Sequence, residues 1–202
     1  KIVIFHTHFS AKLSVLKTML YNRILAKCDG VCFVSKGLEE NVRVVAGLNP
    51  SKSYVLYPGV EFVGVKPEDA SEFRDQHGIP RDAAMLLMHA TTLYKLKARG
   101  ASLLMDALAK LIPRFPETYL VLTREGSFSN ELKEHAKNLN IADKVIFTGD
   151  LDKPELAMAA ADIYTHISYG DGYPISILEA MVAGIPVIAS NIPGIDEAII
   201  NG

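Results

Sequence analysis

Short apolar runs alternate with longer stretches of helical periodicity along this chain. The runs predicted as strands are residues 2–5, 31–34, 53–56, 84–88, 118–122, 144–147, 163–167 and 186–189. The helices for which the sequence predicts both ends are residues 11–27, 68–77, 101–111, 131–138 and 175–182. Strands this apolar are typical of a parallel sheet covered by helices on both faces. With right-handed crossovers, the pattern predicts an α/β fold with a Rossmann-like doubly wound sheet.

The alternation is interrupted once, at Tyr57-Pro58-Gly59-Val60, where a Pro-Gly pair breaks regular structure. We therefore expect a first domain at residues 1–57, a linker at 58–67 and a second domain at 68–202. The first segment has few strands, and the chain stops at Asn201-Gly202, where a helix should lead to another strand. The expectation is a remnant of one domain followed by a second domain truncated at its C-terminus.

Composition excludes several classes of protein. Hydrophobic residues make up 49% of the 202 residues, which is typical of a globular chain and not of a disordered one. The net charge of −2 gives no overall attraction to nucleic acid. No apolar run approaches the roughly 20 residues that span a bilayer, and no charged leader is visible, so we expect a cytoplasmic protein. Cys28 and Cys32 are expected to be buried thiols of a reducing compartment.

Polar residues at the predicted helix starts suggest caps. Ser35 follows a strand and is predicted to cap the next helix. Asp152 and Glu155 have the spacing of a capping box. Only some of the cations between residues 12 and 27 fall on one helical face, and no stripe of large apolar side chains accompanies them. A solvated face is therefore expected, and peripheral association with the membrane surface is left open.

The segment Ser168-Tyr-Gly-Asp171-Gly172-Tyr173-Pro174 joins a predicted strand to a predicted helix. Ligands of open parallel sheets lie at the carboxyl ends of the strands, where free N–H groups of helix starts favour anions. Gly172 permits close approach of the backbone, and Pro174 suits a first helical turn. Asp171 and Glu179 have the acceptor oxygens that vicinal hydroxyls of ribose and hexose need. The alternative is that Asp171 only caps the helix and Glu179 makes a surface ion pair.

The run from Asp171 through Glu179 to Gly184-Ile-Pro186-Val resembles the signature of the large retaining GT-B glycosyltransferase family, the group 1 or family 4 type. That family includes bacterial mannosyl- and glucosyltransferases, and its motif has two Glu separated by seven residues. Runs flanking the motif are similar as well: Lys144-Val-Ile-Phe-Thr-Gly149, Ala161-Asp162, Ile192-Pro-Gly194, Tyr57-Pro-Gly-Val-Glu61 and Phe5-His6-Thr7-His8.

The resemblance implies a role for each matching residue. Glu179 would hold the ribose hydroxyls, Asp171 would contact the donor sugar, and His6 would lie beside the scissile bond, with His8 as a less favoured substitute. Arg99 would stabilise the leaving diphosphate, helped by Lys97 or Lys95. The remaining implied contacts are the backbone of Gly172, Tyr173, Pro174 and Ile175 on the sugar and distal phosphate, and Leu151 near the base.

The sequence also departs from the family pattern. Arg99 fits the position of a family Lys, but Thr92 stands where the family has Arg, and the loop between them is about two residues longer. Lys95 and Lys97 either replace the missing charge or belong to a solvated basic loop. The first Glu of the motif is Asp171, which is shorter by one methylene.

The expected activity is transfer of a sugar from a UDP-, GDP- or ADP-sugar to a hydroxyl of a carbohydrate, lipid or protein acceptor, with retention of configuration. No cofactor or metal is expected to be required, because cations and helix dipoles can neutralise the diphosphate. The alternatives are a catalytically weak or inactive nucleotide-sugar-binding module and a GT-B-like sugar-nucleotide epimerase.

Overall fold

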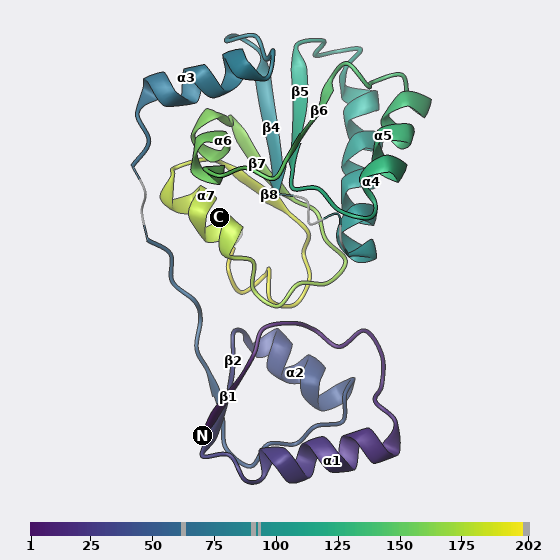
Figure 1. The fold of residues 1–202 in the computed structure, drawn as a ribbon, viewed down its shortest axis with the longest axis vertical. Helices are drawn as coiled ribbons and strands as arrows, with labels where there is room; N and C mark the ends of the chain where they lie inside the picture. The colour runs from purple at the N-terminus through teal and green to yellow at the C-terminus, as the bar shows by residue number, and fades with distance from the viewer. Residues whose placement is uncertain (62–63, 90–91, 93, 200–202) are drawn as a thin grey trace. The chain divides into compact units, whose positions relative to one another are not determined.

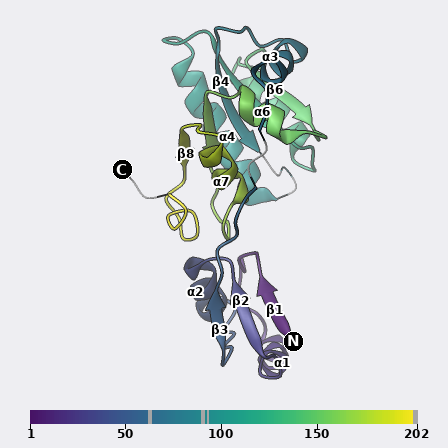
Figure 2. The ribbon, with the colours of Figure 1, turned by 90° about the vertical axis from the view of Figure 1, so that its left-hand side faces the viewer.

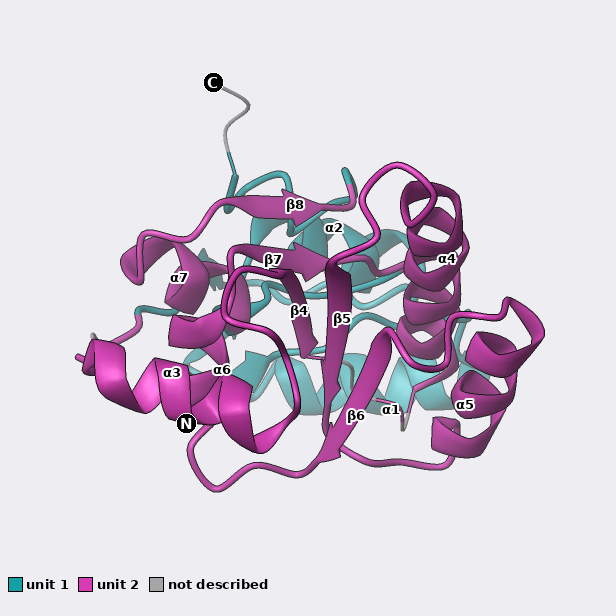
Figure 3. Ribbon diagram, turned by 90° about the horizontal axis from the view of Figure 1, so that it is seen from above, with its two compact units in different colours: residues 1–59, 170–175, 191–202 teal, residues 60–169, 176–190 magenta. Residues whose placement is uncertain are grey.

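The computed structural model describes residues 1–61, 64–89, 92 and 94–199 (Figure 1). Residues 62–63 of the predicted linker, residues 90, 91 and 93 of the loop before Arg99, and the C-terminal Asn201-Gly202 therefore lie outside the described residues. The chain divides into two compact units (Figure 3). Unit 1 comprises residues 1–59, 170–175 and 191–202, and unit 2 comprises residues 60–169 and 176–190. The domain boundaries predicted from the sequence stay predictions.

Unit 1 contains a parallel sheet of order β1-β2-β3 (Figure 2). Its elements are β1 (Ile2–Phe5), α1 (Val15–Leu25), β2 (Gly30–Phe33), α2 (Lys36–Val44) and β3 (Ser53–Val55). Val31 and Phe33 of β2 face the same side of the sheet, where they pack with Leu38 and Val42 of α2 and Leu25 of α1. The alternation of side chains along each strand thus covers one face of this sheet with both helices.

The start of α2 follows the sequence prediction. The Ser35 side chain accepts a hydrogen bond of 3.0 Å from the backbone N–H of Leu38, which confirms Ser35 as the N-cap. The first helix is shorter than predicted, because α1 begins only at Val15 and ends at Leu25.

Unit 2 contains a parallel sheet of order β6-β5-β4-β7-β8. Its strands are β4 (Ala84–His89), β5 (Thr118–Thr123), β6 (Val145–Gly149), β7 (Ile163–His166) and β8 (Val187–Ala189). Its helices are α3 (Pro67–Gln76), α4 (Lys95–Leu111), α5 (Ser129–Asn138), α6 (Pro154–Ala160) and α7 (Ile175–Val182), of which α7 begins at the end of the unit 1 segment 170–175. The strand order reverses between β4 and β7, so the predicted Rossmann-like doubly wound sheet is confirmed.

Both faces of the unit 2 sheet are covered by helices (Figure 3). On one face, Leu86 and Met88 of β4 and Leu120 and Leu122 of β5 pack against α4 and α5. The strand neighbours with the opposite orientation are also buried on the face that carries α3, α6 and α7: Met85, Leu87, Val121 and Tyr164. Burial on both faces explains why these strands are uninterrupted apolar runs in the sequence.

Two local predictions in unit 2 were wrong. The predicted loop before residue 101 is helical from Lys95, so Lys95, Lys97 and Arg99 lie on the first turns of α4. The capping box does not form, because Lys153 and not Asp152 occupies the N-cap of α6, without a side-chain cap hydrogen bond. Pro154 occupies the first turn of α6, where its missing N–H leaves no donor unpaired.

A buried arginine that no sequence motif pointed to ties three elements of unit 2 together. Arg74 of α3 donates to the backbone oxygen of Ala160 at 2.7 Å, to that of Ala83 at 2.8 Å and to Asp162 Oδ2 at 2.8 Å. Asp162 Oδ2 also accepts from the N–H of Met85 at 2.7 Å. The guanidinium therefore satisfies carbonyl groups at the amino end of the sheet, opposite the edge where ligands of such folds bind.

Helix α4 approaches the end of β7 closely at Gly100. A Cβ added at Gly100 would overlap the backbone oxygen of Ile167. We expect Gly100→Ala to lower the free energy of unfolding by at least about 2 kcal/mol, because backbone must shift to admit the methyl group. Urea unfolding measures the change. Gly59→Ala is the control, since nothing lies within 4 Å of its added Cβ, and equal stability of the two variants would contradict the close packing.

Candidate functional site

The reversal of strand order in unit 2 brings polar side chains to the carboxyl ends of neighbouring strands. β4 ends at His89, β5 at Thr123 and β7 at His166. His89 Nδ1 lies 2.6 Å from Thr123 Oγ1, and the ring of His89 lies 5.7 Å from that of Tyr164. Ligands of doubly wound sheets bind outside such a reversal. The sequence predicted a ligand site in the loop after the strand that ends at His166, but it singled out none of these three residues.

His89 is electrically neutral at physiological pH. Burial, the positive charge of Arg124 and the neighbouring His166 together lower its pKa from 6.5 to about 4, with burial as the largest cause. With Nδ1 engaged by Thr123, the imidazole presents its Nε2 edge as a neutral hydrogen-bonding group.

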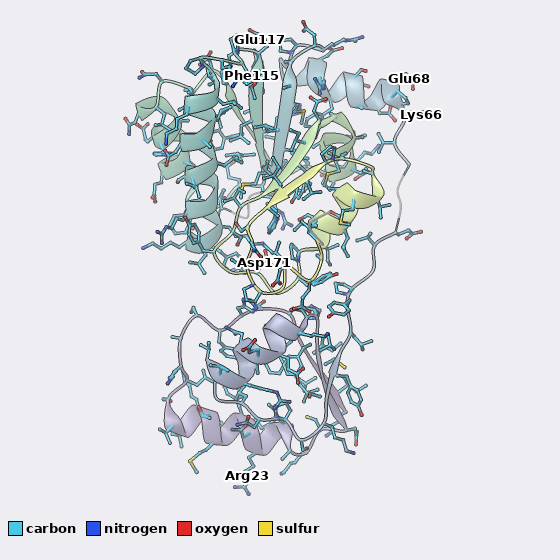
Figure 4. The ribbon with its side chains drawn as sticks, turned by 180° about the vertical axis from the view of Figure 1, so that it is seen from behind. Arg23, Lys66, Glu68, Phe115, Glu117 and Asp171 are labelled. Carbon is cyan, nitrogen blue, oxygen red and sulfur yellow. The ribbon has the colours of Figure 1, made fainter. Side chains whose placement is uncertain are left out.

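A cavity of about 520 Å³ in unit 2 includes His89 in its wall. This volume lies within the range of small-ligand sites. The charged residues of the wall are Glu61, Lys66, Glu155 and Glu179, and the rest is mostly apolar: Val65, Pro67, Ala70, Pro154, Met158, Ala159, Val182, Ala183 and Ile185. Lys66 lies just before α3 (Figure 4). The cavity therefore combines an apolar lining with several carboxylates.

Glu179 is the one sequence-predicted site residue of unit 2 that lines this cavity among the described residues. It lies on α7, which spans Ile175–Val182 as predicted. Burial raises the pKa of Glu179, and the nearby negative charge of Glu155 raises it further. None of the ion pairs of the described residues includes either glutamate. The surface ion pair considered as an alternative for Glu179 is therefore absent from the described part of the chain.

The segment of residues 170–175 belongs to unit 1 and packs tightly there. The Ser35 hydroxyl donates to the backbone oxygen of Gly172 at 2.6 Å. A Cβ added at Gly172 would lie 2.5 Å from the backbone oxygen of His6, so this position excludes any side chain. Tyr173 packs against Tyr57 with ring centroids 5.3 Å apart, and Pro174 is buried, whereas Ile175 is exposed. The need for glycine at residue 172 thus comes from packing against the residue that follows β1.

The two histidines after β1 differ in their surroundings. His6 is exposed, whereas His8 is half-buried and its Nε2 atom is the buried side-chain nitrogen or oxygen without a hydrogen-bond partner among the described residues. Burial lowers the pKa of His8, and the negative charge of Asp171 opposes that change. Figure 4 marks Asp171 on its loop, and its side chain is half-buried. Asp171 therefore acts electrostatically on His8, the histidine that the family resemblance favours less than His6.

A second carboxylate of unit 1 anchors the segment after β8. Glu197 accepts hydrogen bonds from the N–H groups of Lys36 at 2.9 Å and Gly37 at 2.6 Å, and from the Tyr57 hydroxyl at 2.8 Å. Burial alone would raise the pKa of Glu197, but these hydrogen bonds outweigh it and lower that pKa. The hydrogen bond to Glu197 raises the pKa of Tyr57 to about 12. Glu197 thereby neutralises the N-terminus of α2.

The predicted diphosphate-binding cations lie on α4 in unit 2. Arg99 is exposed, and its guanidinium lies 4.5 Å from the centroid of the Tyr169 ring. Lys95 is exposed and Lys97 is half-buried. Thr92, at the position of the family Arg, is buried with its Oγ1 3.2 Å from Ser129 Oγ, so it serves local packing. Leu151 is half-buried after β6 and is not among the residues that line the cavity.

The predicted site residues are thus distributed over both units. His6, Asp171 and Gly172 to Ile175 belong to unit 1, and Arg99, Lys97, Leu151 and Glu179 belong to unit 2.

Within the described ranges, no group of three or more His, Cys, Asp or Glu residues is placed to hold a metal ion. No helix found in those ranges is both long and apolar enough to cross a membrane. Cys32 is buried and Cys28 is half-buried, and both are free thiols.

Comparison with known proteins identifies the family. The family model described as glycosyl transferases group 1 matches residues 69–202. The chain belongs to this family. The family resemblance predicted from the signature around Glu179 is thereby confirmed.

Curated relatives of this group 1 chain are longer proteins. The chain is 34% identical over 167 residues to D-inositol 3-phosphate glycosyltransferase 2 of Catenulispora acidiphila, covering 77% of the chain and 38% of that protein. It is 31% identical over 137 residues to alpha-monoglucosyldiacylglycerol synthase of Streptococcus pneumoniae, covering 67% of the chain and 30% of that protein. The chain therefore spans well under half the length of these two relatives.

Solved structures share the fold. HepE of Anabaena, solved in complex with UDP and glucose, superposes with a TM-score of 0.83 at 23% identity, covering 100% of this chain and 56% of that one. A glycosyltransferase from Rickettsia africae superposes with a TM-score of 0.80 at 23% identity, covering 99% of this chain and 54% of that one. These superpositions place the group 1 chain among glycosyltransferase folds.

The depressed pKa of His89 predicts a pH-dependent stability. The unfolded chain binds a proton near pH 6.5 and the folded chain only near pH 4, so stability is retained above pH 6.5 and lost progressively down to pH 4. We expect this residue to contribute a loss of about 2 kcal/mol in unfolding free energy between pH 7 and pH 5. His89→Gln should remove that part of the pH dependence in urea unfolding. The exposed His6, changed to Gln, serves as the control, and an unchanged profile in His89→Gln would contradict the assignment.

Proposed function

We propose that this protein transfers a sugar from a nucleotide diphosphate sugar to an acceptor hydroxyl with retention of configuration. The observation that carries the proposal is the position of Glu179 in the wall of a largely apolar cavity of about 520 Å³, together with His89 at the reversal of strand order. Glu179 would accept hydrogen bonds from the two ribose hydroxyls. A solved structure of the same fold supports a nucleotide-sugar donor, since HepE was solved with UDP-glucose.

The sugar and the leaving group would be held by different chemistry. Asp171 would accept hydrogen bonds from the donor sugar, and backbone groups of residues 172–175 would bind the sugar and the distal phosphate near the start of α7. Arg99 on α4 would stabilise the negative charge that develops on the diphosphate as the glycosidic bond breaks. Lys97 lies on the same first turns of the helix and would add to that positive charge.

We propose that His8, in place of His6, contacts the donor next to the scissile bond. A buried nitrogen without a partner is costly, and such atoms in native proteins are commonly satisfied by a ligand or water. In a front-face reaction the bond between the anomeric carbon and the diphosphate breaks first, and the acceptor oxygen then bonds to that carbon from the same side. The acceptor proton passes to the departing phosphate oxygen, so the chain need not supply a base. The role we assign to His8 is to hold the donor sugar through its Nε2 atom, which has no hydrogen-bond partner among the described residues.

Nucleotide binding tests the role of Glu179. UDP, GDP and ADP are added to the intact protein in thermal unfolding, and a nucleotide at 100 times its dissociation constant should stabilise it by about 2.7 kcal/mol. Glu179→Ala should abolish the stabilisation, whereas Glu131→Ala on the exposed surface of α5 should keep it. Since the pKa of Glu179 is raised, binding should weaken on acidification at a pH above the ordinary carboxyl value of 4.5. Equal stabilisation of both variants would refute the ribose contact.

Turnover tests the role of His8. We expect His8→Ala to lower the rate of sugar transfer by about a hundredfold with little change in nucleotide affinity, because it removes a contact to the reacting sugar. His6→Ala is the matched control and should stay within a few-fold of the unaltered protein. Tight nucleotide binding without transfer or hydrolysis would instead indicate a nucleotide-sugar-binding module. Conversion of the donor sugar without any acceptor, followed by NMR, would indicate an epimerase.

A further inference from the structure

The cavity that contains Glu179 has an unusual charge for a nucleotide site. Among the described residues, its charged wall residues are three carboxylates, Glu61, Glu155 and Glu179, against the cation Lys66, and His89 is neutral at physiological pH. A diphosphate inside this cavity would face net negative charge. The cavity therefore suits the uncharged nucleoside part of a nucleotide, whose phosphates would lie outside it, toward the helix starts and cations.

Two of these carboxylates interact with each other. Glu155 on α6 and Glu179 on α7 line the same cavity, and the charge of Glu155 adds to burial in raising the pKa of Glu179. Carboxylates only accept hydrogen bonds when ionised, so a ligand that donates to both would relieve their repulsion. In the proposed function the ribose hydroxyls bind Glu179, which leaves Glu155 for the remainder of the nucleoside.

The bases differ in what they offer to a carboxylate. Guanine presents two adjacent donors, N1–H and the 2-amino group, which match the two oxygens of one carboxylate. Uracil presents N3–H between two carbonyl oxygens, which a carboxylate repels. Adenine presents its amino group beside an acceptor nitrogen. Of the three common donor bases, guanine is the one whose edge satisfies both oxygens.

We propose that Glu155 is a specificity-determining residue that accepts hydrogen bonds from the N1–H and 2-amino groups of guanine, so that the donor is a GDP-sugar. The inference rests on the proposed function, because it requires a nucleoside in this cavity with its ribose on Glu179. The apolar side chains of Met158, Val182 and Ile185 provide the contact surface for the planar base.

Dissociation constants of GDP, inosine diphosphate, UDP and ADP for the intact protein test the proposal. GDP should bind at least about tenfold more tightly than UDP and ADP, since a hydrogen bond to a charged group contributes about ten- to a hundredfold in affinity. Inosine diphosphate, which lacks the 2-amino group, should bind more weakly than GDP. This comparison needs no altered protein and so stands even if a variant folds poorly.

Glu155→Gln is the matched variant, with Glu131→Gln on α5 as the control. Glu155→Gln should weaken GDP binding by about ten- to a hundredfold, because one paired acceptor is replaced by an amide, and should leave UDP and ADP within about threefold. UDP or ADP binding as tightly as GDP, or GDP binding unchanged in Glu155→Gln, would overturn the base assignment and leave the proposed function intact. Failure of every nucleotide to bind would overturn the proposed function itself.

Discussion

The site in unit 2 depends on the pairing of β4 with both β5 and β7. After β4 the chain adds β5 and β6 on one side of β4, and it adds β7 and β8 on the other side only later. The helices that connect these strands therefore lie on both faces of the sheet (Figure 3). His89, Thr123 and His166 end neighbouring strands at this reversal. Close backbone packing fixes the arrangement, since Gly100 of α4 leaves no room for a methyl group against Ile167. The cavity beside His89 is thus a consequence of strand order.

In unit 1, close backbone packing holds a loop in place. Gly172 fits against the backbone oxygen of His6 only because it has no side chain, and the Ser35 hydroxyl both caps α2 and binds the Gly172 carbonyl. These contacts hold Asp171 near His8, whose buried nitrogen has no partner among the described residues. The glycine and the serine therefore position the histidine–aspartate pair without themselves contributing a charged group.

The sequence predicted the fold well because the strands of unit 2 are buried on both faces, so that their apolar runs leave a clear signal. The start of α4 was missed because the resemblance suggested a loop there, although Lys95, Leu96, Lys97, Ala98 and Arg99 are all good helix formers. The capping box failed because the pattern of Asp152 and Glu155 does not specify which residue takes the extended backbone of the N-cap. The cavity was beyond prediction, since its wall joins residues 61 to 185 that no single motif connects.

The positions of the charged side chains explain how the chain can lack the family Arg at residue 92. Thr92 is buried against Ser129, so no cation stands there, and the positive charge of this region comes from the first turns of α4, where Arg99 stacks on Tyr169. Positive charge at a helix N-terminus is unfavourable to the helix dipole, which the binding of an anion would offset. The cavity around Glu155 and Glu179 carries the opposite charge. A nucleotide, the ligand that we propose, has the complementary division, with donor groups on its ribose and base and negative charge on its phosphates. A ligand must satisfy both requirements at once, which is stricter than either alone.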